Sequence, residues 1–255
     1  MIVVKQLTKT FKLSRQQKRE RGEDFSGSMI DAVREVSFTC TPGRIFTLLG
    51  PNGAGKTTAL RMIATMLKPT SGTITVMGYD IARQPQEIRC RMGFLTGSTG
   101  LYDRLTPNEL VKYFADLYSM EKNEYQRRRD ELFALLDMND FANRRIGKLS
   151  SGMRQKVSIV RTMIHDPEVV VFDEPTVGLD VVTSRNIIQL IRSCKDAGKT
   201  IVFSTHRMGE VSLLSDDLAI IHKGQLCFND TYEQFLGRMQ TRSVEDEFIR
   251  LVEEA

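Results

Sequence analysis

Long apolar runs are missing from this 255-residue sequence, and so is any recognisable leader segment. A membrane-spanning helix needs roughly 20 consecutive apolar residues, and no stretch of the chain comes near that length. The opening MIVVKQLTKTF lacks the basic-then-apolar layout and the small-residue cleavage site of a signal peptide. We therefore expect the chain to remain in the compartment where it is made, the cytosol.

Closely spaced cysteines are also missing. Cys40, Cys90, Cys194 and Cys227 lie far apart and form no C-x-x-C pair, which argues against a zinc site or a redox motif and favours buried thiols in a reducing compartment. The net charge is only +4, whereas nucleic-acid binding usually needs a concentrated basic face. We expect no nucleic-acid partner.

What the sequence does contain is an alternation of short apolar runs and helical patterns. Residues 45–49, 169–172 and 201–204 are apolar, β-branched and bounded by turn residues, which is typical of buried parallel strands. Helical spacing follows at residues 56–67 and 181–197. This alternation predicts an α/β fold with a mostly parallel sheet covered on both faces.

The ends of the chain depart from this pattern. Residues 2–7, 33–40 and 73–76 are predicted to be antiparallel strands, and residues 219–228 a hairpin. The tail after Ser243 is amphipathic and is expected to cap the fold. Residues 13–28 are polar and rich in charge, which indicates a mobile loop; a basic patch that touches lipid or a partner is the alternative.

The middle of the chain is predicted to be helical. Thr106-Pro107-Asn108-Glu109 is a capping box with proline at the first helical position. Two helices are expected to follow, with core positions at Leu110, Phe114, Leu117 and Tyr118 in the first and at Leu132, Phe133, Leu135 and Leu136 in the second. The expected organisation is a core of residues 1–82 and 149–240, a helical insert of residues 83–148 and a tail of residues 241–255.

Residues 50–57 fit the phosphate-loop pattern G-x-x-x-x-G-K-[ST]. Glycines let backbone amides converge on phosphates, and the N-terminus of the following helix adds positive potential. Lys56 would reach the β- and γ-phosphates, and the Thr57 hydroxyl would bind Mg²⁺. The strand before the loop and the helix after it favour a phosphate loop over a glycine-rich turn that fits the pattern by chance. The loop predicts a site for a nucleoside triphosphate.

Two further motifs point to the same chemistry. The apolar strand over residues 169–172 ends in Asp173 and Glu174, and strands of an open α/β sheet present functional side chains at their carboxyl ends. Asp173 would hold the Mg²⁺ shell and Glu174 would polarise the attacking water. Ser150, Ser151 and Gly152 precede a helix and predict a second anion site, although a plain helix cap explains either serine in isolation.

Together these motifs resemble the nucleotide-binding subunits of ABC transporters. GPNGAGKTT is similar to the Walker A loop of that family, LSSGM to its signature, VVVFDEP to Walker B, residues 177–180 to the D-loop and the histidine of STH to the switch histidine. The resemblance runs from about Val4 to Glu233, with the motifs in family order. It implies a P-loop ATPase fold of the ABC type, with a mostly parallel core, an antiparallel β subdomain and an inserted α-helical subdomain.

The resemblance also implies the role of each residue. Catalysis is assigned to Glu174, His206 and Lys56, and Mg²⁺ binding to Thr57 and Asp173. ATP would be bound by Phe11, Gly50, Pro51, Asn52, Gly53, Ala54, Gly55, Lys56, Thr57, Thr58, Ser150, Ser151, Gly152 and Asp180. Phe11 would stack on adenine, although a lone aromatic could equally belong to the core. Because no N-K-x-D guanine motif is present, ATP is favoured over GTP.

Two positions depart from the family pattern. Glutamine is usual where this chain has Gly97, followed by Ser98 and Thr99, so water or one of those hydroxyls would have to replace it at Mg²⁺. Ser151 stands where glycine is usual, and a small residue there is a mild change. At these two positions the chain matches the family's nucleotide-contacting residues least well.

The resemblance implies a head-to-tail dimer, here of two identical chains, in which the signature of one chain closes on ATP held by the other. Such a dimer would energise a transporter through a separate membrane permease, peripheral on its cytoplasmic face. The run GFLTGSTGLYDRLTPNEL is similar to ATPases of bacterial sodium- or drug-extruding exporters. The alternative is a soluble ABC ATPase that acts on an assembly scaffold, and the copurifying partner would separate the two.

Overall fold

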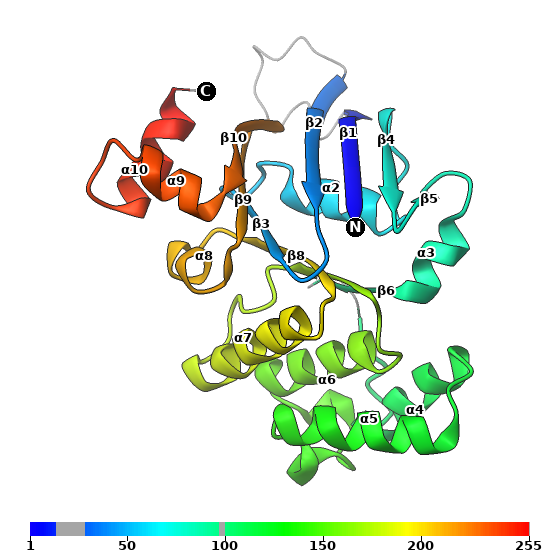
Figure 1. The fold of residues 1–255 in the computed structure, drawn as a ribbon. Coiled ribbons are helices and arrows are strands. Elements are labelled where there is room, and N and C mark those ends of the chain that lie inside the picture. Colours follow the sequence, from blue (N-terminus) through cyan, green and yellow to red (C-terminus); the bar gives the residue numbers. More distant parts are fainter. Residues whose placement is uncertain (14–28, 97–99, 255) are drawn as a thin grey trace. The chain divides into compact units, whose positions relative to one another are not determined.

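The computed structural model describes residues 1–13, 29–96 and 100–254 (Figure 1). The predicted loop after Leu13 and the positions of Gly97, Ser98 and Thr99 therefore lie outside the described residues. Two compact units make up the chain. The first comprises Met1–Cys40, Phe46–Ile88 and Thr205–Ala255, and the second comprises Thr41–Ile45 and Arg89–Ser204.

The first unit contains the predicted antiparallel sheet. Strand β1 (Ile2–Lys12) pairs with β2 (Met29–Cys40) on one side and with β4 (Ser71–Val76) on the other, and β4 pairs with the short β5 (Tyr79–Asp80) (Figure 1). Along the second half of β2, buried and exposed residues alternate, which is the pattern of a sheet with one packed face and one solvated face.

Strand β3 (Ile45–Leu49) leads into the phosphate loop. It pairs in parallel with β9 (Asp217–His222), which forms a hairpin with β10 (Gln225–Thr231). All five residues of β3 are buried. The helix after the loop, α2 (Lys56–Ile63), is shorter than the predicted 56–67. It ends early because Thr65 takes a left-handed conformation (φ 59°) and the Met66 amide closes back onto the Arg61 carbonyl.

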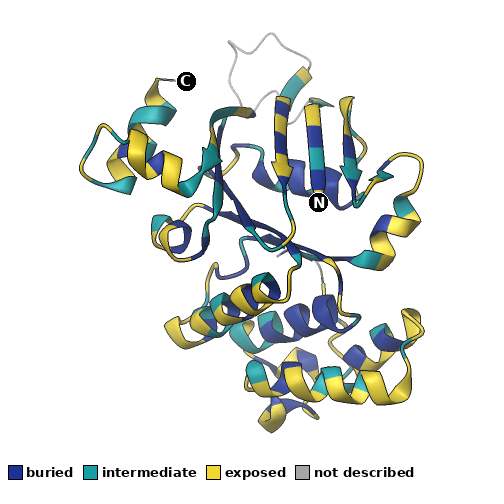
Figure 2. Ribbon diagram, viewed as in Figure 1, coloured by how far each residue is buried: buried dark blue, intermediate teal, exposed yellow. Residues whose placement is uncertain are grey.

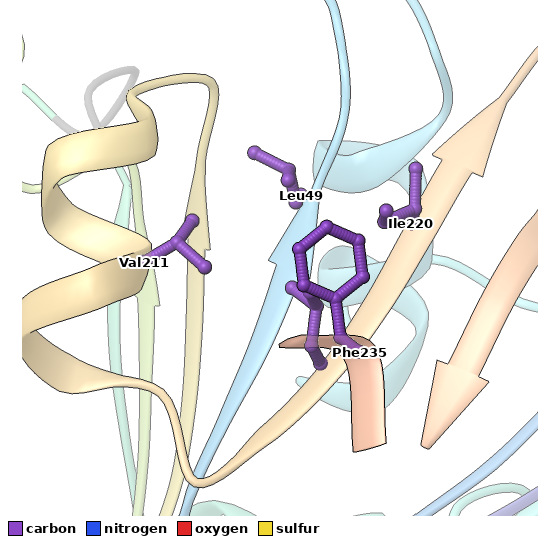
Figure 3. Packing of buried hydrophobic residues seen from close by; sticks show 5 residues of the cluster. Leu49, Val211, Ile220 and Phe235 are labelled. Atoms are coloured by element: carbon purple, nitrogen blue, oxygen red, sulfur yellow. The ribbon is translucent and has the colours of Figure 1, made fainter. Parts of the chain in front are cut away.

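Three helices complete the first unit: α8 (Met208–Leu214), α9 (Tyr232–Arg238) and α10 (Val244–Glu253). They enclose a core whose labelled members in Figure 3 are Leu49, Val211, Ile220 and Phe235. The apolar face of α10 packs on this core through Val244, Phe248, Leu251 and Val252. The prediction that the tail caps the fold is confirmed.

The second unit contains three parallel strands, β6 (Met92–Thr96), β7 (Val169–Asp173) and β8 (Thr200–Thr205). Every residue of β7 and β8 is buried, as expected for strands covered on both faces. Helix α6 (Ser151–Met163) precedes β7, and α7 (Val181–Asp196) connects β7 to β8. The parallel pairing predicted for residues 169–172 and 201–204 is confirmed.

The remaining helices are α3 (Pro85–Arg91), α4 (Pro107–Leu117) and α5 (Lys122–Leu135). The capping box at Thr106 is present in full. The predicted core spacing of α4 is wrong for Leu117 and Tyr118, which are 60% and 36% exposed, and only partly right for Phe114, which is half-buried. The residues of α4 that are buried are Pro107, Leu110, Val111 and Ala115. Figure 2 distinguishes buried from exposed parts of the helices by colour.

Cysteine burial follows the prediction in part. Cys40 and Cys194 are buried, but Cys90 is exposed because α3 buries only Ile88. All four cysteines are free. Within the described ranges, none of the helices is long and apolar enough to cross a membrane.

Candidate functional site: the phosphate loop and the ends of β7 and β8

The phosphate loop is shaped by backbone that comes very close to it. Gly53 and Gly55 have φ of 79° and 109°, values at which a side chain is strained. A Cβ on Gly50 would lie 2.3 Å from the Ile221 carbonyl oxygen, and one on Gly55 would lie 2.3 Å from the Ala32 carbonyl oxygen. Neighbouring strands of the same unit therefore require Gly50 and Gly55 to lack a side chain.

The loop closes around its lysine. Lys56 is 4% exposed, and its Nζ donates to the carbonyl oxygens of Gly50 (2.7 Å) and Pro51 (3.1 Å). The Gly224 amide donates to the Ala54 carbonyl oxygen (2.9 Å) and holds the loop from the side of the β9–β10 hairpin. Gly55 is the N-cap of α2, so the helix end that carries positive potential has no capping side chain of its own there.

A second bond joins the loop to the predicted switch histidine. The Gly50 amide donates to the carbonyl oxygen of Thr205 (3.3 Å), and His206, which is exposed, follows directly. The Thr205 hydroxyl donates to Glu210 Oε2 (2.7 Å), while the Arg207 guanidinium pairs with Glu210 Oε1 (3.0 Å). The buried Glu210 carboxylate thus fixes the residues on both sides of His206.

Sequence reasoning missed Glu210. Its signal in the sequence is an acidic residue beside Val211, in a helix whose Val211 and Leu214 side chains are buried. Because buried carboxylates need a partner, an acid at that position indicates a local hydrogen-bond network.

Phe11 lies on β1 with 38% of its side chain exposed. The interpretation of Phe11 as a core residue is therefore wrong. Lys9 Nζ sits 5.1 Å from the ring centroid, a cation–π distance. An exposed, flat aromatic surface of this kind is what adenine stacking requires.

In the second unit, the end of β7 presents the two predicted carboxylates. Asp173 is buried, and Oδ1 accepts a hydrogen bond from the Ser204 hydroxyl (2.8 Å). The Glu174 amide donates to the same hydroxyl oxygen (3.1 Å) and to the Ser204 carbonyl oxygen (3.2 Å). Ser204 on β8 therefore sets the position of both acidic residues.

Glu174 has a strained backbone. Its φ is 49°, a left-handed conformation that costs a residue with a side chain about 1–3 kcal/mol. The turn that begins there includes the buried Pro175 and Thr176. Such strain persists only where the surroundings fix it, and here the two bonds from the Glu174 amide to Ser204 fix it.

The signature motif forms the first turn of α6. Ser150 is the N-cap, and Oγ accepts from the Met153 amide (3.3 Å). A Cβ on Gly152 would lie 3.6 Å from Asp180 Oδ2 and 3.7 Å from Thr183 Oγ1, so the signature and the D-loop of one chain are neighbours. Any side chain larger than a methyl group at Gly152 would press on that contact.

Asp180 is the N-cap of α7. Its Oδ1 accepts from the Thr183 amide (2.9 Å) and its Oδ2 from the Thr183 hydroxyl (2.8 Å). These hydrogen bonds lower the pKa of Asp180 below its ordinary value of 3.8, and the bond from the Thr183 backbone amide has the largest effect. The carboxylate therefore stays ionised at neutral pH, next to the signature.

The predicted residues thus fall into two groups. The first unit holds Phe11, the loop of residues 50–58 and His206, and the second holds Asp173, Glu174, Asp180 and the signature serines. The predicted Mg²⁺ ligands, the Thr57 hydroxyl and the Asp173 carboxylate, are both oxygen donors. They suit an ion that takes few protein ligands and completes its shell with phosphates and water, and the described residues contain no cluster of three or more acidic, His or Cys ligands.

Comparison with known proteins assigns the family. The family model described as "ABC transporter" matches residues 33–177. ABC transporter ATP-binding protein NatA of Bacillus subtilis is 47% identical over 206 residues, which cover 80% of this chain and 84% of NatA. Daunorubicin resistance ATP-binding protein DrrA2 of Streptomyces coeruleorubidus is 36% identical over 190 residues, covering 74% of this chain and 59% of DrrA2. The chain belongs to the ABC transporter family, as an ATP-binding subunit.

Solved structures agree with that assignment. The ATP-binding subunit of an ABC transporter superposes with a TM-score of 0.83 at 25% identity, covering 98% of this chain and 99% of that one. A dimeric ATP-binding cassette in a post-hydrolysis state, bound to ADP and Pi, superposes with a TM-score of 0.78 at 26% identity, covering 91% and 98%. The α/β fold of the ABC ATPase type is confirmed. The protein is an ATPase that couples ATP hydrolysis to transport.

Proposed function

We propose that the chain is the ATP-hydrolysing subunit of an exporter and works as a head-to-tail homodimer on a separate membrane permease, at its cytoplasmic face. Export is supported by relatives named for drug resistance, DrrA2 and the linearmycin resistance protein LnrL of Bacillus subtilis, which is 31% identical over 207 residues. The alternative, a soluble ATPase acting on an assembly scaffold, is not favoured because the named relatives are transporter components.

The chemistry of the site rests on Glu174 above all. We assign to Glu174 the activation of the water that attacks the γ-phosphate. Its carboxylate follows the buried Asp173 at the strained end of β7, and Ser204 fixes the position of both residues. Lys56 contacts the β- and γ-phosphates, and His206 holds the γ-phosphate and the water. Thr57 and Asp173 would hold Mg²⁺, which when bound would neutralise charge on the phosphates.

The remaining nucleotide contacts are assigned across the dimer. The exposed end of α6, with Ser150, Ser151 and Gly152, is the anion site for ATP bound to the partner chain. Asp180 lies beside Gly152 and contacts the same interface. The other residues of the loop and Phe11 bind the nucleotide in their own chain.

Replacement of the water-activating carboxylate tests the catalytic assignment. Glu174→Gln removes the base and leaves the phosphate loop intact, so ATP binding should persist while turnover falls by about 10²–10⁴-fold. The matched control is Glu168→Gln, an exposed carboxylate just before the same strand, which should retain wild-type turnover. Turnover by Glu174→Gln at the control's rate would refute the assignment.

Mixed dimers test the shared site. Lys56→Ala and Ser150→Ala should each be inactive alone, because every site then lacks either its loop lysine or its signature serine. In a mixture, dimers that contain one chain of each kind have one intact site, and ATPase activity should rise above both parents. A mixture as inactive as its parents would contradict the head-to-tail arrangement.

Affinity purification from the native membrane tests the partner. An integral membrane protein that copurifies, and whose removal abolishes ATP-driven efflux from cells, would support the exporter. Copurification with soluble scaffold proteins instead would favour the alternative.

A further inference from the structure

In the second unit, residues 103–105 before α4 are joined to residues 146–154 by hydrogen bonds and an ion pair. The Ile146 amide donates to the Leu105 carbonyl oxygen (2.8 Å), and the Gly147 amide donates to the Asp103 carbonyl oxygen (3.0 Å). The Asp103 side chain reaches further, since Oδ1 pairs with Arg154 Nη1 at 2.7 Å. Asp103 therefore contacts both Gly147, in the segment before α6, and Arg154, in α6 itself.

Arg154 belongs to the first turns of α6. Its amide donates to the carbonyl oxygen of the N-cap, Ser150 (2.9 Å), and its guanidinium also donates to the Ile146 carbonyl oxygen (3.4 Å). The Asp103–Arg154 pair thus spans the turn that carries Ser150 and Gly152. We propose that Asp103 is a positioning residue for ATP hydrolysis, which acts through Arg154 to orient the signature turn.

The pair is too exposed to serve stability. The side chains of Arg154 and Asp103 are 35% and 64% exposed, and ion pairs in such positions contribute about 0–1 kcal/mol. The same pair can still affect the reaction rate by orienting the signature turn, because a misplacement of about 1 Å in a catalytic assembly can lower the rate on the order of 10²-fold. An effect on turnover without an effect on unfolding is therefore the mark of this role.

Close packing of Gly147 against Asp103 accompanies the ion pair. A Cβ on Gly147 would lie 3.1 Å from the Cβ of Asp103 and 3.2 Å from its carbonyl oxygen. Glycine at this position lets the Asp103 backbone approach the signature segment closely enough for the carboxylate to reach Arg154.

The proposal is tested by a double-mutant cycle on the full chain. Asp103→Ala and Arg154→Ala should each lower kcat about 10-fold or more, with ATP affinity and Tm within error of wild type. The control is Asp116→Ala, which breaks the exposed Lys112–Asp116 pair on α4 and should leave kcat unchanged. If the pair acts as one unit, Asp103→Ala adds no further loss in an Arg154→Ala background. Additive losses, or a kcat for Asp103→Ala equal to that of the control, would overturn the proposal.

The inference rests on the proposed action of the signature in trans, and mixed dimers separate the two. Asp103→Ala mixed with Lys56→Ala should recover activity, whereas Asp103→Ala mixed with Ser150→Ala should not, because both defects then fall on the signature side. Normal turnover in Ser150→Ala alone would remove the shared-site model itself. A defective Ser150→Ala beside a fully active Asp103→Ala would leave that model standing and refute only the role of Asp103.

Discussion

At the scale of single residues, the acidic strand end depends on a serine that belongs to another strand. Ser204 donates to Asp173 and accepts from the Glu174 amide, so one hydroxyl fixes the proposed Mg²⁺ ligand and the proposed base. The serine does this from β8, although it lies 31 residues after Asp173 in the sequence.

Ser204→Ala is therefore expected to lower kcat by about 10–100-fold, an effect typical of a lost supporting contact, while nucleotide binding by the phosphate loop persists. Stability should fall by about 1–2 kcal/mol because Asp173 loses a buried hydrogen bond. Steady-state ATPase assays with thermal unfolding separate the two effects. Ser212→Ala, at an exposed serine on α8, is the control, and equal kcat for both variants would contradict the role of Ser204.

Residue-level features can be recognised in the sequence where they follow a local pattern. The loop of residues 50–57 could be read directly because its glycines, lysine and threonine are contiguous. Ser204 could not, because its partner Asp173 lies 31 residues away in sequence and is brought close only by folding. Glu210 could not either, because its partners Thr205 and Arg207 are near it in sequence but only the folded chain shows that its carboxylate is buried between them. Hydrogen bonds between strands leave no periodic trace in the sequence.

At the scale of elements, the C-terminal helix α10 is held by a buried carboxylate. Glu247 is only 2% exposed and accepts bonds from the Arg250 guanidinium (2.6 Å) and from the amides of Gln240 and Thr241. The bond from Arg250 is the largest cause that lowers the pKa of Glu247 from 4.5 to about 2. The carboxylate thus ties the helix to the loop that precedes it.

The lowered pKa gives a pH dependence of known sign. A carboxyl group whose pKa is lower in the folded state stabilises the fold above its unfolded pKa of about 4.5 and loses that contribution as the pH falls toward 2. At pH 7, Glu247→Gln should be less stable by about 1–3 kcal/mol, from weakened charge-assisted bonds. Unfolding measured between pH 7 and pH 2 should show wild type and variant converging. A gap that stays constant over this range would refute the contribution of Glu247.

Element boundaries were predicted well where a capping residue sets them and poorly where packing does. Thr106 begins α4 as its capping box predicts. The end of α2 was placed too late, because the left-handed turn at Thr65 closes the helix ahead of the Lys68-Pro69 signal. Leu117 carries the right periodicity but is 60% exposed in the last turn of α4.

At the scale of the whole molecule, the proposed site is complete only in a dimer. Glu174→Gln, which should bind ATP without hydrolysing it, is therefore expected to accumulate as a dimer with ATP and to remain monomeric with ADP. Size-exclusion chromatography with light scattering measures this directly. Lys56→Ala in the same background should prevent the dimer from forming, and a dimer that is indifferent to nucleotide would contradict the model.

The bond from the Gly224 amide to Ala54 has a consequence for how the protein is made. The loop glycines are synthesised early, but the hairpin that supports them appears about 170 residues later, which at 5–20 residues per second is roughly 10–30 seconds of translation. During that interval the nascent chain contains the whole Walker A motif without the β9–β10 hairpin that supports it from one side. Ribosome-bound chains arrested before residue 217 should therefore not bind ATP, whereas chains released after the hairpin has emerged should. ATP binding by the nascent chain would thus show when the first unit finishes folding.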